Sequence, residues 1–589
     1  MDPLDLVLLD LIDTLLGENV AGAADALDAD AAGVPGVACA EGERWCRIPA
    51  TGGALIFRCR DGGPLQPWRL SRAPVWHVGD VERELAPAEV LGLLADRDLP
   101  GYDVVTADLR AAVEHTEVTH AGWSTLAERT PQPGGLLTGE RLAETRNRPF
   151  HPTARAVSGW SSAELSEYGP MRQTPLALRW IAARRDRLRH GEDTTSDRIA
   201  DVLLGRSERE QLSDAMRTSD VDVNEYQPIP VHPWQFDRVL PAEWADEIAA
   251  RDVVPLDCHL GRFRPTTSLR TLTSASDPTM HVKLPLGVST LGAARLLPPR
   301  YLDNGDKAQR TLRWLLGTDP TLADRVTLCD ERTWCGWHAS AVDEFTDRPG
   351  QLAAQVRRYP QGVVTNDTIA LPMAALAAHE WHHLAPALGV DDPVGFFREI
   401  ATAYCAMTFA LLGNGVLPEL HGQNVVAVFP AIHMSTAARP RFVLRDHDTI
   451  RLCPRWMAEA GTPDPGYRIK PGAPQSLCLD EPETLIGYAQ TLGFQVNLYG
   501  IADAIARHYG LDERVFWRAL ADAVTVSIDA AAVRDDVRDT LRAVLLDAPE
   551  WPSRQVLGPL LHAGRGNGVS MPAATGSVPN PLLPMAVRR

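Results

Sequence analysis

The stretch that most restricts the fold of this chain is "PVGFFREIATAYCAMTFALLG" at residues 393–413, which is apolar almost all the way round a helix. A helix without a polar face is stable only when it is buried. The turn Gly413–Gly415 ends it, and two runs with β-branched residues follow, "VLPELHGQNVVAVFP" and "RFVLRDHDTIRL". About ten residues that include Pro430 and Pro440 separate the two runs. The pattern predicts a buried helix and then a strand–loop–strand hairpin.

The chain is 589 residues long, more than one hydrophobic core usually organises, so we expect two or three domains. Residues 1–125 mix a helical start with short strand-like runs such as "GGALIFRC" and an acidic helical stretch. Residues 126–350 are rich in Arg, Pro and His and carry compact polar clusters, as expected of a segment that lines a site. Residues 351–589 are again largely helical in pattern.

The net charge of −18 argues against a general attraction to nucleic acid or to anionic lipid. Small molecules are therefore the expected partners. The first residues, "MDPLDLVLLDLIDTLL", carry four aspartates and no basic residue, which predicts an amphipathic helix and not a signal peptide. No apolar run is long enough to span a bilayer, so we expect a cytoplasmic protein.

The nine cysteines are odd in number and scattered, and no two of them are spaced C-x-x-C. This usage predicts reduced thiols in a cytoplasmic protein and neither a disulfide framework nor a zinc ribbon.

Residues 379–383 read "HEWHH" and match H-E-x-x-H, the zinc peptidase signature. A helix here would place His379 and His383 one turn apart, but Pro386 follows almost at once and the next acid, Glu399, lies on the apolar helix. Such a short pattern also arises by chance. A zinc hydrolase is therefore a minor alternative, and a histidine cluster on a surface helix is the preferred interpretation.

Several polar clusters share one chemistry, that of binding a triphosphate and an acidic substrate. No G-x-x-x-x-G-K-[ST] loop and no G-x-G-x-x-G after a strand is present. The chain offers hydroxyl groups beside Arg270, the ammonium of Lys283 and the guanidinium of Arg295, which can bind a carboxylate through two parallel donors. The clusters are "HPTARAVSG" (151–159), "VHPWQ" (231–235), "SLRT" (268–271), "KLPLGV" (283–288) with Arg295, "ELHGQN" (419–424) and "RDHD" (445–448).

The predicted hairpin adds hard oxygen ligands. Asn424 at the start of one strand and Asp446 and Asp448 at the end of the next would meet across the ladder and could bind Mg²⁺ on a triphosphate. Structural alternatives stay open: Asp448 as a turn cap, His232 as a packed histidine, and the arginines as partners in interdomain salt bridges.

The ordered set of clusters, closed by "VPNPL" at 578–582, resembles the IucA/IucC-type family of siderophore synthetases that are independent of nonribosomal peptide synthetases. The resemblance covers nearly the whole chain, and H-E-x-x-H plays no part in it. It implies an α+β fold of thumb (1–125), fingers (126–350) and palm (351–589), with a kinase-like strand hairpin in the palm, and a homodimer. It also implies ATP and Mg²⁺ as cofactors in activating a carboxylate as an acyl-adenylate, which an amine or alcohol then attacks.

The resemblance also assigns residues. It implies Lys283, Arg270 and His421 as catalytic residues, and Arg295, His421 and Thr290 as ligands of the acid. Glu419, Asn424 and Asp446 are the implied Mg²⁺ ligands. The residues implied to bind ATP are His151, Ser268, Arg270, Thr271, Lys283, Gln423, Asn424 and Asp446.

Three departures from the family pattern bear on the substrates. Arg155 and Val157 replace a Lys and an Arg of the first cluster, and Leu291 stands where many relatives have a Thr before the substrate arginine. Near the C-terminus only Arg554 and Arg565 are available where the family usually has a lysine, so no basic acceptor residue is assigned.

The sequence thus predicts an ATP-dependent carboxylate–amine or carboxylate–alcohol ligase of siderophore assembly, with citrate as the first candidate acid. Alternatives are 2-oxoglutarate, a citryl half-amide, and a protein of the same scaffold that binds a siderophore or citrate without catalysis. A set of metal ligands argues against the last alternative, because binding a carboxylate alone does not need them.

Overall fold

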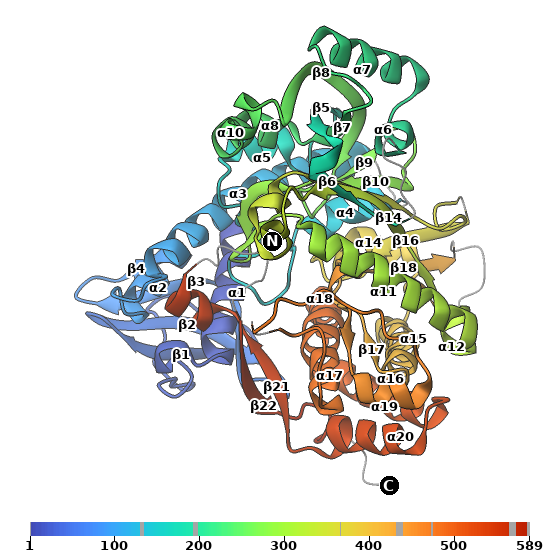
Figure 1. Cartoon of the computed structure of the whole chain (residues 1–589). Coiled ribbons are helices and arrows are strands. Elements are labelled where there is room, and N and C mark those ends of the chain that lie inside the picture. Colours follow the sequence, from blue (N-terminus) through green and yellow to red (C-terminus); the bar gives the residue numbers. More distant parts are fainter. Residues whose placement is uncertain are drawn as a thin grey trace.

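The computed structural model describes residues 2–129, 135–192, 198–365, 367–430, 440–472, 475–564 and 573–585. It is an α+β protein in which three larger sheets, two of four strands and one of eight, are accompanied by helices (Figure 1). The predicted fold class is confirmed. No helix among these residues combines the length and hydropathy that a bilayer crossing needs.

The N-terminal part holds an antiparallel sheet in the order β1–β2–β3–β4, packed with helices on a shared core. Its core includes Leu557, Leu560 and Leu561 from a helix in the last part of the chain, so a segment distant in sequence packs on the N-terminal part (Figure 1). The elements are α1 (Pro3–Gly17), β1 (Arg44–Ala50), β2 (Gly53–Asp61), β3 (Trp68–Gly79), β4 (Arg83–Glu84), α2 (Pro87–Leu94), α3 (Tyr102–Arg129) and α21 (Leu557–Ala563).

The first helix, α1, forms as predicted, but the expected exposed polar face is wrong. Every residue from Leu6 to Leu16 is buried, including two aspartates. Asp10 pairs with Arg155 at 3.1 Å and Asp13 pairs with Arg69 at 2.6 Å. These arginines come from distant parts of the chain and neutralise the buried carboxylates, which a helical pattern alone cannot reveal.

The expectation that all nine cysteines are reduced is wrong for one pair. Cys46 on β1 and Cys59 on β2 form a disulfide, with their Cα atoms 6.0 Å apart. The neighbouring antiparallel strands bring the two residues together, a proximity that their spacing in the sequence does not show. The other seven cysteines are free.

The central sheet has eight strands in the order β6–β14–β15–β10–β9–β8–β5–β7, and every pairing in it is antiparallel. Residues of α6, α7 and α8 contribute to the core of this sheet. The elements are β5 (Leu176–Arg184), β6 (Leu188–His190), α6 (Arg198–Leu203), α7 (Arg206–Thr218), β7 (Tyr226–Val231), α8 (Pro233–Arg238), β8 (Val253–Pro265), β9 (Thr271–Ser274), β10 (Met280–Lys283), β14 (Asp330–Trp337) and β15 (Ala353–Arg358).

The second four-stranded sheet carries the predicted hairpin, and its order is β13–β19–β18–β16. β18 (Val425–Pro430) pairs antiparallel with β19 (Arg441–Leu444), with Val425 opposite Leu444. The hairpin is therefore confirmed; its loop, residues 431–439, lies outside the described residues. The predicted buried helix is also confirmed as α15 (Pro393–Gly413), most of which is inaccessible to solvent.

The other elements around this sheet are mostly helical, and they share one large core with α15. β13 comes from the segment before residue 350 yet pairs in parallel with β19, and the domain boundaries at 125 and 350 stay a prediction. The elements are α4 (Leu136–Glu144), α11 (Pro299–Thr318), α12 (Pro320–Arg325), β13 (Val326–Leu328), β16 (Thr368–Pro372), α13 (Met373–Leu376), α14 (Trp381–Leu388), α17 (Pro482–Tyr488), α18 (Tyr499–Tyr509), α19 (Arg514–Ala530) and α20 (Asp535–Arg542).

A buried carboxylate joins the N-terminal sheet to the helical part. Asp503 of α18 is fully buried and accepts from Arg69 of β3 at 2.9 Å and from Arg146 at 2.7 Å. Arg60 of β2 and Arg507 lie at 3.2 and 2.9 Å from the same carboxylate. Because the carboxylate balances several guanidinium groups away from water, its loss would leave them uncompensated.

We therefore predict that Asp503→Asn lowers the free energy of unfolding by about 3–5 kcal/mol, the usual cost of breaking a buried ion pair on one side. Urea unfolding followed by circular dichroism measures the change. Glu210→Gln is the matched control, because Glu210 pairs with Arg206 on an exposed helix surface and should change stability by less than about 1 kcal/mol. Equal effects of the two substitutions would contradict the role given to Asp503.

Candidate active site

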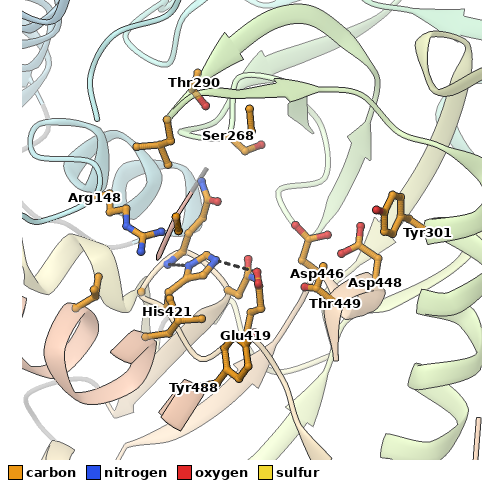
Figure 2. Close-up of a pocket in the computed structure, with 18 of the residues that line it drawn as sticks. Arg148, Ser268, Thr290, Tyr301, Glu419, His421, Asp446, Asp448, Thr449 and Tyr488 are labelled. Atoms are coloured by element: carbon orange, nitrogen blue, oxygen red, sulfur yellow. Dashed lines mark hydrogen bonds and ion pairs between the residues drawn. The ribbon is translucent and has the colours of Figure 1, made fainter. Parts of the chain in front are cut away.

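A cavity of about 1020 Å³ lies where the eight-stranded sheet meets the helical part of the chain. Figure 2 shows side chains of both parts facing each other across it. The predicted clusters "SLRT", "KLPLGV" with Arg295, "ELHGQN" and "RDHD" all contribute to its wall, as do Ala154, Arg155 and Val157 of the first cluster. The chain therefore brings together most of the polar clusters that the sequence singled out.

Two clusters do not line this cavity. His232 of "VHPWQ" is fully buried against the rings of Trp160 and Tyr168, and its Nδ1 accepts from the backbone N–H of Trp234 at 3.2 Å. Burial lowers the pKa of His232 to about 3. Asn580 of "VPNPL" donates to backbone carbonyl groups at 3.2 and 2.7 Å. Both clusters make contacts with the backbone nearby, which agrees with the alternative of a packed histidine kept for His232.

Lys283 lies in the part of the cavity that the sequence predicts to bind a nucleotide, formed by "SLRT", Lys283 and "RDHD" and called the nucleotide half below. It ends β10, which is paired on both sides, opposite Thr271 of β9 and Gln355 of β15. Its ammonium group donates to Asp446 and lies 3.5 Å from Asp448. The strand pairing fixes the backbone of Lys283, so its charge is held between two carboxylates of the loop after β19.

The loop that carries these carboxylates is itself held by a buried ion pair. The backbone N–H groups of Asp446 and His447 donate to Glu331 of β14, at 3.0 and 3.2 Å, and Glu331 is paired with Arg357 of β15. Asp446 adopts a left-handed conformation with φ of 65°. Such a conformation is costly for a residue other than glycine and is frequent at functional sites.

The carboxyl groups of this loop have opposite pKa shifts. Burial would raise the pKa of Asp446, but Lys283, Arg357 and Arg270 outweigh it and hold the pKa well below its usual range. Burial raises the pKa of Asp448 to about 6, and the charge of Asp446 adds to this against the effect of Lys283. The cations present therefore compensate Asp446 well and Asp448 poorly, so this half of the cavity favours one more positive charge.

The "SLRT" turn gives the wall beside Lys283. Ser268 Oγ accepts from the backbone N–H of Thr271 at 3.2 Å, and Arg270 donates to the carbonyl of Leu296. Leu269 has φ of 63°, a second left-handed residue at the cavity. Ser268, Arg270, Thr271 and Lys283 line the same cavity, and their binding of ATP stays a prediction.

Arg295 lies on a small hairpin, β11 (Leu286–Thr290) and β12 (Ala293–Arg295). Its turn residues Leu291 and Gly292 both have positive φ, 55° and 75°, which fits a two-residue hairpin turn. Arg295 donates to both the side chain and the carbonyl of Thr290. Leu291 thus takes part in the turn, and Thr290 supplies the contact to the arginine.

His421 is oriented from both sides. Its Nδ1 accepts from the backbone N–H of Gln423 at 3.3 Å, and its Nε2 lies 3.6 Å from Glu419 (Figure 2). The tautomer that fits these contacts carries its proton on Nε2. Glu419 also pairs with Arg451 at 3.2 Å. Burial would raise the pKa of Glu419, but His421, Arg451 and Arg554 hold it well below its usual range.

The structure brings Asn424 close to Asp446 but leaves Glu419, the third predicted metal ligand, with other partners. Asn424 precedes β18, and its carbonyl accepts from Arg445 at 3.1 Å, so the residue before Asp446 is directly opposite Asn424. The side chain of Glu419 is instead engaged by Arg451 and His421. His151 is fully buried and does not line the cavity, and its role in ATP binding stays a prediction.

The sequence analysis assigned no role to several charged residues of this site, including Arg554, which it named without assigning it. Glu331 and Arg357 lie behind the Asp446 loop, and no local pattern distinguishes them from ordinary strand residues. Arg148 and Arg554 line the cavity. Arg148 is three residues before the first cluster, and this proximity is the only signal that could have pointed to it. Arg565, the other basic residue considered near the C-terminus, lies outside the described residues.

The H-E-x-x-H stretch does not form a zinc peptidase site. The helix α14 begins at Trp381, so the expected helical pair of His379 and His383 is wrong. The side chains that approach one another are Glu380, His382 and His383, whose ligand atoms lie within 4.8 Å, and none of them lines the cavity. Glu380 also accepts from Trp123 at 3.2 Å.

Known protein families and relatives match most of the chain. The IucA / IucC family matches residues 139–378, and the description "Ferric iron reductase FhuF-like transporter" matches residues 396–568. The staphyloferrin B synthase of Staphylococcus aureus is 30% identical over 590 residues, which span 98% of this chain and 97% of that protein. The aerobactin synthase of Escherichia coli is 29% identical over 28% of this chain and 29% of its own length.

Solved structures share the fold along the whole chain. The petrobactin biosynthesis protein AsbB of Bacillus anthracis has a TM-score of 0.79 at 19% identity, covering 99% of this chain and 95% of that one. ATP-bound aerobactin synthetase IucA of Klebsiella pneumoniae has a TM-score of 0.73 at 17% identity, covering 98% and 100%. The chain belongs to the IucA/IucC-type family of siderophore synthetases.

A buried acid in the cavity wall gives a pH-dependent prediction. Burial raises the pKa of Glu144 at the end of α4 to about 8, and Asn147 donates to it at 3.1 Å. Between its ordinary pKa and this raised pKa, Glu144 keeps a proton in the folded state that it releases in the unfolded chain. The free energy of unfolding therefore falls as pH rises from about 4.5 to about 8. Glu144→Gln keeps the neutral form at every pH.

We predict that Glu144→Gln becomes more stable relative to the unchanged protein as pH rises from 6 to 9. Urea unfolding at both pH values measures this difference. A relative stability that stays constant, or that falls towards pH 9, would show that Glu144 is ionised in the folded protein at neutral pH.

Proposed function

We propose that this siderophore synthetase is an ATP- and Mg²⁺-dependent ligase that activates a carboxylate as an acyl-adenylate and transfers the acyl group to an amine or alcohol. Citrate is the first candidate acid, with 2-oxoglutarate and a citryl half-amide as alternatives. The observation that carries the proposal is the position of Lys283 between Asp446 and Asp448, beside Arg270, in a cavity that also holds Arg295 and His421.

The nucleotide half of the cavity fits a triphosphate. Attack of a carboxylate on the α-phosphorus brings two negative groups together, and nearby fixed cations offset that repulsion. Lys283 and Arg270 supply two such charges, and the "SLRT" turn adds hydroxyl donors. Asp446 and Asp448 neutralise Lys283, so a phosphate that bound the lysine would release two carboxylates.

The donor set fits a magnesium ion. Asp446 and Asp448 offer carboxylate oxygens, Asn424 an amide oxygen, and the raised pKa of Asp448 indicates negative charge that the resident cations do not balance. Asp446, Asp448 and Asn424 would hold the ion, and Glu419 fits less well because Arg451 and His421 engage it. Bound there, magnesium supplies positive charge that screens the triphosphate.

The remaining residues fit the acid and the acceptor. Arg295 presents a planar pair of donors suited to a carboxylate. His421 is held in one tautomer between Gln423 and Glu419, and we propose that this pair orients the acid and assists proton removal from the attacking amine or alcohol. A protein that only bound a carboxylate would not need the triphosphate-binding half. A homodimer and a cytoplasmic location remain part of the proposal.

Asp446→Asn tests the nucleotide half. We predict a loss of pyrophosphate release of at least 100-fold, because the carboxylate that pairs with Lys283 and contributes to the magnesium site loses its charge. Steady-state kinetics with ATP and Mg²⁺ measure it. Asp214→Asn on the surface helix α7 is the control and should turn over normally. If Asp446→Asn did so as well, the nucleotide site would have to be placed elsewhere.

Arg295→Lys tests the acid half. The lysine keeps the charge but loses the paired donors. We therefore expect kcat/KM for the acid to fall by a factor equivalent to roughly 1.5–3 kcal/mol, the range for hydrogen bonds to charged groups. The KM for ATP should stay nearly constant. The measurement is pyrophosphate release with acid and ATP varied separately. A defect confined to the KM for ATP would assign Arg295 to the nucleotide.

The function as a whole is tested with a panel of acids crossed with amines. Pyrophosphate release and product mass are measured for each pair. We expect ATP-dependent amide or ester formation from a citrate-type acid. If ATP were hydrolysed but no pair of acid and amine gave a condensed product, the proposal would be contradicted.

A further inference from the structure

Arg148 is an arginine in the cavity wall that has no partner among the described residues. It follows α4, and its side chain points into the cavity towards His421 (Figure 2). It makes no hydrogen bond or ion pair with any described residue, and its Nη2 atom is buried without a partner. An unsatisfied buried donor is costly, so a donor of this kind that faces a cavity is suited to bind an acceptor group of a ligand.

Arg554 shares this condition. It lies on β21 (Glu550–Gln555), opposite Thr575 of β22 (Ala574–Pro579), and lines the same cavity. Its Nε atom is also buried without a partner, and it forms no ion pair with a described residue. Two arginines from distant segments, one after α4 and one near the C-terminus, therefore face the same space without a bound carboxylate.

The charges of this half of the cavity do not balance. The carboxylate that influences both arginines is Glu419, which already pairs with Arg451 at 3.2 Å. Burial lowers the pKa of Arg148 to about 9, and the positive charges of Arg554 and Arg295 add to this effect. In a chain with a net charge of −18, such a concentration of unpaired positive charge is a specific feature of the site.

Figure 2 shows Arg148 on the opposite side of His421 and Glu419 from Asp446 and Asp448. Arg295 is influenced by Arg270 and Asp446, which belong to the nucleotide half. Arg148 is influenced by Arg554, Glu419 and Arg295. Arg148 therefore faces a part of the cavity away from Asp446 and Asp448, where it would meet a group of the substrates that is not being activated.

We propose that Arg148 and Arg554 form a carboxylate subsite that binds a second carboxylate of the substrates, separate from the carboxylate activated beside Lys283. This inference rests on the proposed ligase function and specifies its substrate class. Guanidinium groups bind carboxylates through parallel, charge-assisted hydrogen bonds, and two of them can enclose one carboxylate. The second carboxylate belongs either to a polycarboxylic acid or to an acceptor amine that carries its own carboxylate.

The two sources are separated by two assays on Arg148→Gln. In the first, hydroxylamine replaces the amine, so that only the acid occupies the subsite; a rise of at least 10-fold in the KM for citrate identifies the acid. In the second, 2,3-diaminopropionate is compared with 1,2-diaminoethane, which differs by the carboxylate. A loss of at least 10-fold in the preference for 2,3-diaminopropionate identifies the acceptor. No change in either assay would overturn the proposal.

Binding and stability provide further readouts. Citrate and 2,3-diaminopropionate are titrated calorimetrically into both proteins, and at least one should bind the variant at least 10-fold more weakly. Because Arg148 has no partner, Arg148→Gln should melt no lower than the unchanged protein. A lower melting temperature together with unchanged binding would show a structural role and overturn the proposal.

Two controls complete the experiment. Arg148→Lys keeps the charge and should recover part of the lost affinity, and Arg206→Gln removes an exposed arginine far from the cavity and should change neither assay. A failure of the proposed ligase function would appear in the unchanged protein, as absence of hydroxamate from every acid. A failure of the present proposal would instead appear in an active variant, as unchanged substrate constants or unchanged binding.

Discussion

The contact of Lys283 with Asp446 and Asp448 is the interaction on which the site depends. Lys283 ends a central strand of the eight-stranded sheet, and the two aspartates follow the hairpin of another sheet. The contact thus joins the two walls of the cavity across its nucleotide half. Removing one side of such a partly buried pair leaves a charge without compensation, so the relative position of the two sheets and the chemistry of the site are coupled.

Glu331 extends this coupling into the core of the sheet. It binds Arg357 on the neighbouring strand and accepts from the backbone of the Asp446 loop, which holds Asp446 in its left-handed conformation. The cavity therefore has one half in which Lys283 pairs with carboxylates and an arginine-rich half around Arg295, Arg148 and Arg554. Poorly compensated charge costs stability, and its concentration in one cavity is typical of a site built for a charged ligand.

The sequence predicted those parts of the fold whose pattern is local. The helix at 393–413 and the hairpin after it follow from hydropathy and β-branched runs, and both are confirmed. The burial of α1 was missed because Asp10 and Asp13 look like a solvent-exposed face, whereas arginines distant in sequence neutralise them. The Cys46–Cys59 pair was missed for the same reason: strand register is not visible from residue spacing.

The site was predictable to the extent that its residues occur in compact clusters. "SLRT", "ELHGQN" and "RDHD" converge on one cavity as expected. Glu331, Arg357, Arg148 and Arg554 stand alone in the sequence, and only the fold gives them neighbours. His151 shows the converse, because it belongs to a recognisable cluster and yet is buried behind the cavity wall.

The central claim is that a carboxylate bound in this cavity attacks the α-phosphorus of ATP, which releases pyrophosphate and gives an acyl-adenylate. The most direct test uses citrate labelled with ¹⁸O in its carboxylates, with the full protein, ATP, Mg²⁺ and an accepted amine. Formation of an acyl-adenylate followed by attack of the amine leaves one labelled oxygen in AMP, and we predict that label by mass spectrometry. Label in inorganic phosphate with ADP as the nucleotide product would indicate an acyl phosphate and contradict the account.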